Sequence, residues 1–152
     1  MNVINLSGDE HLLRLKSALL RVSHVLSDER YRQTRIYRMA LARRFTVCYA
    51  AFLTYLVSRV RMYEDAHEDL GMYAIVQRCR QYRVLDVSDE RMVIQMSMLY
   101  VTLSYVSEGF DGKSDALLAD IPKMIAFLES FIVRYEILPL QSTPVAATIA
   151  GS

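Results

Sequence analysis

The stretch of this chain best suited to binding a ligand is rich in arginine. Residues 30–63 contain eight arginines and no acidic residue. Arginine side chains neutralise phosphate groups, and tyrosine rings interspersed among them can stack on bases. We therefore expect this stretch to bind a nucleotide, RNA or another polyanion. The candidate ligand-binding residues are Arg35, Arg38, Arg43, Arg44, Tyr31 and Tyr37.

The alternative to ligand binding is that acidic side chains of the same chain neutralise these arginines. Residues 1–85 carry fourteen Arg and Lys against eight acids, whereas residues 86–152 carry four against nine. The acidic half could pair with the basic half, which would make the arginine-rich stretch an ordinary solvated face. The composition leaves both interpretations open.

Side chains suited to metal binding are sparse. The one cluster of suitable types consists of Glu64, Asp65, His67, Glu68 and Asp69. This cluster is the only candidate for a metal site, but acids at this density are ordinary on a surface and favour a solvated turn between helices. We expect no metal and no cofactor.

Nucleophilic catalysis would need a cysteine beside a histidine and a third orienting group. Cys48 and Cys79 lie within apolar helical patterns, which indicates buried structural thiols, and His11 and His24 are interpreted as partly exposed surface residues. The chain has no Gly-rich phosphate loop and no signal-peptide pattern. These features predict a cytoplasmic protein without a catalytic set of its own.

Long helices must position these residues, because the chain is 53% hydrophobic yet has only five Gly and three Pro. Ser7 and Glu10 have the spacing of a capping box, and Ser88 before two acids favours another helix start. Pro122 suits the first turn of the last helix. The expected helices cover residues 8–27, 32–63, 70–82, 88–107 and 120–137.

The predicted fold class is all-α, an up-and-down antiparallel bundle of four to five helices. The bundle domain spans residues 1–137, and a flexible, uncharged tail spans residues 138–152. Apolar residues at steps of three and four predict the inward stripe of the second helix. That stripe consists of Leu41, Phe45, Tyr49, Phe52, Leu56 and Val60.

One expected helix has no charge between residues 92 and 107, and its apolar side chains cover more than one face. Such a helix is either central in the bundle or buried in a dimer, and we expect a homodimer formed through it. The longest weakly polar run, residues 45–57, has thirteen residues. A membrane span needs roughly 20, so we expect no membrane contact.

The order of the helices and four short stretches resemble the nucleotidyltransferase substrate-binding branch of the HEPN superfamily. These proteins are small helical bundles that partner a separate minimal nucleotidyltransferase. The similarity covers about residues 10–137. The four stretches are the leucine-rich residues 12–26, RMALARRF at 38–45, GMYAIVQR at 71–78 through VLD at 84–86, and IPK at 121–123.

The chain departs from this family at its characteristic motif, an Arg followed five residues later by a His, often with Asn directly after the Arg. Leu99, Tyr100 and Ser104 stand at these positions. In active members the Arg and His handle phosphate charge and proton transfer in metal-free RNA cleavage. Leucine and an unassisted serine cannot do so, and Thr46 and Ala50 replace the acids usual in the second helix.

The resemblance therefore implies a non-catalytic HEPN-like binding protein. Its implied partners are a second copy of the chain, a separate nucleotidyltransferase subunit, and a nucleotide or RNA held by the arginines. A purely structural or regulatory homodimer is the alternative. The enzyme alternative is a metal-independent ribonuclease that uses displaced catalytic residues.

Overall fold

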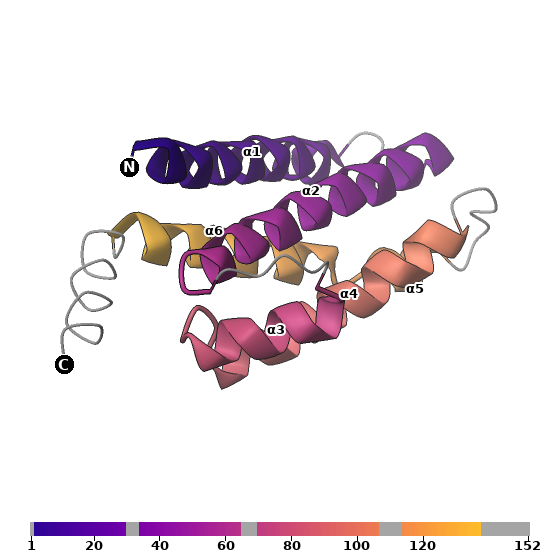
Figure 1. Cartoon of the computed structure of the whole chain (residues 1–152). Coiled ribbons are helices and arrows are strands. Elements are labelled where there is room, and N and C mark those ends of the chain that lie inside the picture. The colour runs from indigo at the N-terminus through magenta and orange to yellow at the C-terminus, as the bar shows by residue number, and fades with distance from the viewer. Residues whose placement is uncertain (1, 30–33, 65–69, 107–113, 138–152) are drawn as a thin grey trace.

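The chain folds into an all-α bundle, as the sequence predicts, in the computed structural model shown in Figure 1. The structure describes residues 2–29, 34–64, 70–106 and 114–137. Tyr31, the acidic residues within 65–69 and the predicted tail over 138–152 lie outside the described residues. The helices are α1 (Asn2–Ser27), α2 (Arg35–Arg61), α3 (Met72–Gln81), α4 (Val87–Val106), α5 (Ser114–Leu118) and α6 (Ile121–Ile137).

Helix α2 is the centre of the bundle. It packs against α1, α3, α4 and α5, and Figure 1 shows it running between α1 on one side and α3 and α4 on the other. All six residues of the predicted inward stripe are buried. By length and composition α2 is the one helix among the described residues that could cross a membrane. Its ten buried side chains account for that apolar character within the bundle core.

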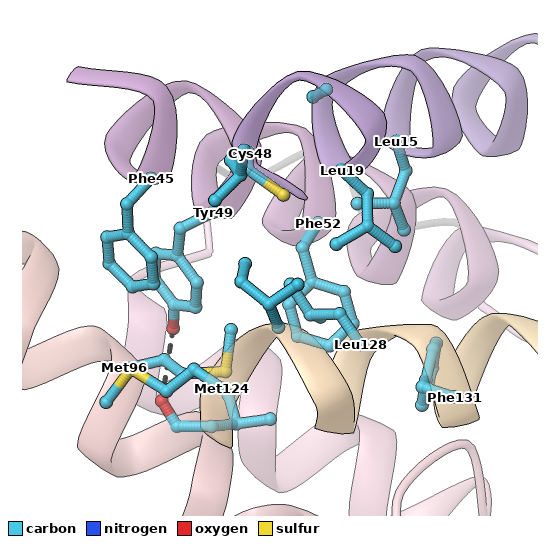
Figure 2. Packing of buried hydrophobic residues seen from close by; sticks show 14 of the residues in the cluster. Leu15, Leu19, Phe45, Cys48, Tyr49, Phe52, Met96, Met124, Leu128 and Phe131 are labelled. Atoms are coloured by element: carbon cyan, nitrogen blue, oxygen red, sulfur yellow. Dashed lines mark hydrogen bonds between the residues drawn. The ribbon is translucent and has the colours of Figure 1, made fainter. Parts of the chain in front are cut away.

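Aromatic side chains from α2 and α6 fill the core. The Phe52 and Phe131 rings meet edge to face with centroids 5.2 Å apart, and Tyr55 makes a second edge contact with Phe131 at 6.2 Å. Leu15 and Leu19 of α1 point into the same core, toward Phe52 and Leu128 (Figure 2). Edge-to-face rings of this size bury large apolar areas and fix the angle between α2 and α6.

Two capping residues differ from the sequence-based expectation. Helix α1 already includes Ser7, so the Ser7–Glu10 pair lies inside the helix and is not its N-terminal capping box. The cap of α4 is Asp86 and not Ser88: the Asp89 amide donates to the Asp86 carboxylate at 2.8 Å, and the Asp86 amide donates to the Asp89 carboxylate at 3.0 Å. A reciprocal pair of this kind satisfies two free amides, which Ser88 in the first turn cannot do.

Helix α2 begins three residues later than expected. The Thr34 hydroxyl accepts a hydrogen bond from the Tyr37 amide at 3.1 Å and caps the helix. At the other end of the chain, Pro122 occupies the first turn of α6 as predicted, where no amide donor is missed. The order of the five expected helices and the inward face of α2 are therefore confirmed, and the corrections concern helix ends and the short helix α5, which was not among the expected helices.

Candidate anion-binding pocket

The residues predicted to bind a ligand do not form one surface. Arg35, Arg43 and Arg44 are exposed, whereas Arg38 is half-buried. Arg35 and Arg44 are nine residues apart, about two and a half helical turns, so they project from opposite sides of α2. Tyr37 is only 7% exposed because it packs into the core. The expectation of an accessible Tyr37 ring for base stacking is therefore corrected.

Arg44 is the member of this set that reaches a pocket. An open surface pocket of about 630 Å³ lies where α1 and α2 pack together. Its walls include a second arginine, Arg21, and His24, both from α1. The remaining lining residues are Leu20, Ser23, Val25 and Ser27.

The core packing of α1 explains this placement. Leu15, Leu19 and Val22 are buried at steps of four and three, which commits one face of α1 to the core. At about 100° per residue, Arg21 and His24 then fall outside that face and point to solvent. Two residues three apart on a helix are surface neighbours, so their cationic or hydrogen-bonding groups can act on one ligand.

The electrostatics of the pocket favour an anion. Arg21 and Arg44 have no ion pair within the described part of the chain, unlike Arg14, whose guanidinium lies 2.5 Å from Glu10. On α6, the Glu129 carboxylate accepts a hydrogen bond from the hydroxyl of the pocket residue Ser23 at 3.3 Å. Two guanidinium groups and an imidazole provide N–H donors for an oxyanion, with Glu129 limiting its approach on one side.

Internal neutralisation accounts for other basic residues but not for these two arginines. Ion pairs between the basic half and the acidic half of the chain are represented by Arg80 with Glu90, at 3.1 Å. Arg78 pairs instead with Glu64, just beyond the end of α2, at 2.8 Å, which ties α3 to that residue. The pairing predicted from the charge asymmetry is thus real for part of the basic half and leaves Arg21 and Arg44 available.

The positions aligned with the HEPN motif lie elsewhere, on α4. Leu99 is buried in the core, and the Tyr100 ring packs against Tyr49 with centroids 5.4 Å apart. Ser104 is exposed, and its hydroxyl donates to the Tyr100 carbonyl at 2.8 Å. A serine engaged with its own helix in this way is occupied by a local hydrogen bond.

The two cysteines are buried and free, as expected. Burial raises the pKa of both the Cys48 and the Cys79 thiol from 9.0 to about 12. A thiol with such a pKa is almost entirely protonated at neutral pH, so neither is an activated nucleophile. No group of three or more metal-ligating side chains occurs among the residues that the structure describes.

No family model, no curated protein and no solved structure matches this chain. Assignment of the pocket therefore depends on the geometry of its own residues. Sequence inspection identified Arg44 but missed Arg21 and His24, because only the packing of α1 on α2 brings them to the same pocket. The spacing of Arg21 and His24, three residues apart beside a core stripe, was the one signal available in the sequence.

Proposed function

We propose that this chain is a non-catalytic binding protein whose ligand carries a phosphate group, held in the pocket between α1 and α2. The observation that carries the proposal is the convergence of Arg21, His24 and Arg44 on one pocket, with both arginines unpaired within the described residues. Exposed like charges that lack acidic partners repel one another, and a bound phosphate removes that repulsion.

The apolar part of the pocket favours a nucleotide or RNA over free phosphate. Leu20 is 72% exposed in the pocket wall, and the half-buried Val25 lines the same pocket. A base or sugar could cover Leu20 while the phosphate contacts the guanidinium groups. Free phosphate would use only the charged part, so we expect a nucleotide to bind more tightly.

The resemblance to the HEPN superfamily fits this proposal and extends it. A substrate-binding partner of a minimal nucleotidyltransferase would have to hold a phosphate-bearing ligand without cleaving it. The proposed pocket supplies charge and hydrogen-bond donors for that task. The partner is then a separate nucleotidyltransferase subunit, and the bundle itself performs no chemistry.

A titration with labelled single-stranded RNA, AMP and inorganic phosphate tests the proposal. We expect AMP and RNA to bind, with an affinity that falls steeply from low to high salt, because phosphate contacts release counterions. Arg21→Glu with Arg44→Glu should weaken AMP binding by about tenfold or more at low salt. Circular dichroism should show unchanged helicity, since both side chains are exposed.

Arg43→Glu with Arg61→Glu is the matched control. These arginines are exposed and eighteen residues apart, about five full turns, so they share one side of α2 that Arg44 does not. The control makes the same change in net charge and should leave AMP binding within about twofold. Equal losses in both double variants, or no binding by the wild-type chain at low salt, would show the pocket assignment to be wrong.

A further inference from the structure

Helix α4 has a second apolar face, on the side away from the core. The core face is buried and includes Val93, Met96, Leu99 and Leu103. The opposite face, which we call the outer stripe, exposes Val87 (55%), Ile94 (39%), Met98 (66%), Val101 (44%) and Tyr105 (87%). Their spacing of seven, four, three and four is the heptad pattern by which one helix packs along another.

The size of the outer stripe is unusual for a face left in water. Its five side chains together expose apolar surface on the order of 500 Å², comparable to the largest patch on a typical monomer. Residues 92–106 contain no charged side chain, so no ionic group on this helix interrupts the stripe there. The sequence left two alternatives for this helix, a central place in the bundle or burial in a dimer, and the first does not account for the outer stripe, because no element of the described chain covers it.

We propose that the outer stripe is covered by the same stripe of a second copy of this chain, with the two α4 helices antiparallel and crossing at Met98. A standard interface buries about 800 Å² on each partner, of which the stripe would supply more than half. Flanking polar residues of α4, such as Gln95 and Thr102, are exposed and would form the rim.

The charge pattern selects the antiparallel arrangement. Arg91 is the one charged residue in register with the outer stripe, and it has no ion pair among the residues described. Arg91 and Tyr105 lie seven residues on either side of Met98, about 10 Å along the helix in each direction. An antiparallel pair therefore places each Arg91 against the Tyr105 ring of the other copy, where a cation–π contact is favourable. A parallel pair would instead set the two Arg91 guanidinium groups side by side.

Sedimentation equilibrium at high micromolar concentration tests the association. The wild-type chain should sediment at about 35 kDa, twice the 17.5 kDa of one chain. Met98→Glu should shift it to the monomer and weaken the dimer at least tenfold, because two carboxylates would meet at the crossing point. Leu13→Glu is the matched control: Leu13 is 64% exposed on α1, so the same change of an exposed apolar residue should leave the dimer intact.

Cysteine cross-linking tests the orientation. Met98→Cys should give a disulfide-linked dimer on mild oxidation, whereas Val87→Cys should not, because antiparallel helices bring only the crossing position next to itself. Cys48 and Cys79 are buried and will not compete. A wild-type monomer, a dimer that Met98→Glu leaves intact, or equal cross-linking at residues 87 and 98 would each overturn the proposal.

The proposed dimer is independent of the anion-binding pocket. The pocket lies between α1 and α2, and Figure 1 shows α2 running between α1 and α4. Met98→Glu should therefore leave AMP binding unchanged if that binding occurs. Failure of the dimer and failure of the pocket can be told apart in the same set of variants.

Discussion

The Tyr49 hydroxyl of α2 donates a hydrogen bond to the Val93 carbonyl of α4 at 3.2 Å and also pairs with the Ser97 hydroxyl. Tyr49 itself is completely buried. This contact fixes the register of α4 against the central helix, and through it the direction in which the outer stripe faces. A buried hydroxyl left without a partner would be costly, so the three groups act as one unit.

Tyr49→Phe removes this hydroxyl while keeping the ring. We expect the free energy of unfolding to fall by about 1 kcal/mol, since one buried hydrogen bond is lost and Ser97 still donates to the Val93 carbonyl. Urea denaturation measures the change. Tyr73→Phe, at a ring of α3 that is 69% exposed and lies outside the outer stripe, should change stability by less than about 0.5 kcal/mol. Equal effects at the two positions would mean that the buried contact contributes no net stability.

The Arg134–Asp89 pair, which ties α6 to the start of α4, should matter more than an exposed pair. The Arg134 guanidinium lies 2.9 Å from a carboxylate that is buried, and its central carbon lies 5.5 Å from the centroid of the Phe131 ring. Arg134→Leu should cost about 2–3 kcal/mol, because Asp89 would keep a buried charge without its cation.

Arg80→Leu is the control for that variant. Arg80 and Glu90 are 3.1 Å apart, but both side chains are about a third exposed, so solvent screens their attraction. We expect a loss below about 1 kcal/mol by urea denaturation. A larger loss for Arg80→Leu than for Arg134→Leu would contradict the argument that burial of Asp89 decides the difference.

Most of the fold could be predicted from the sequence, because the signals for helix positions and inward faces lie within short stretches of the chain. The steps of three and four identified the inward side of α2, and Pro122 identified the start of α6. Both features depend on residues within one or two turns. Cap choice was less predictable: Asp86 and Ser88 are both good caps, and only the pairing of Asp86 with Asp89 separates them.

The candidate pocket was predictable only in part, because it depends on contacts between helices. Arg44 was identified from its neighbours in sequence, but nothing in sequence distance connects it with Arg21, twenty-three residues earlier. Tyr37 was misjudged for the same reason. Its position among arginines suggested a surface, whereas packing of α2 buries it. Tertiary structure decides which side of a helix is covered, and periodicity alone does not identify its neighbour.

Three buried groups predict how stability depends on pH. Burial raises the pKa of Cys48 and Cys79 from 9.0 to about 12, and that of Tyr49 from 10.0 to about 12. The unfolded chain therefore releases these protons at lower pH than the folded chain does. The stability that these three groups contribute is fully present below about pH 9 and is lost as the pH rises toward 12.

Urea denaturation at a series of pH values from neutral to alkaline measures this loss. The double variant Cys48→Ala with Cys79→Ala removes two of the three groups, so its stability should fall less steeply with pH than that of the wild-type chain. The variant will also be less stable at neutral pH, because truncation leaves small cavities. The quantity to compare is therefore the slope of the free energy of unfolding against pH. Identical slopes for the variant and the wild-type chain would exclude the cysteines as the cause of the loss at alkaline pH.

The ribonuclease alternative makes a different prediction for the pocket, because His24 lies on its wall beside Arg21 and Arg44. Metal-free cleavage needs a base for the attacking 2′-hydroxyl, an acid for the leaving oxygen, and fixed donors at the developing charge. The exposed His24 ring has no orienting hydrogen bond recorded among the described residues, so it meets these needs poorly. We expect labelled RNA to be bound but to remain intact in the presence of a chelator. Cleavage by the wild-type chain that disappears in His24→Ala, with RNA binding retained, would make the pocket an active site and the non-catalytic assignment wrong.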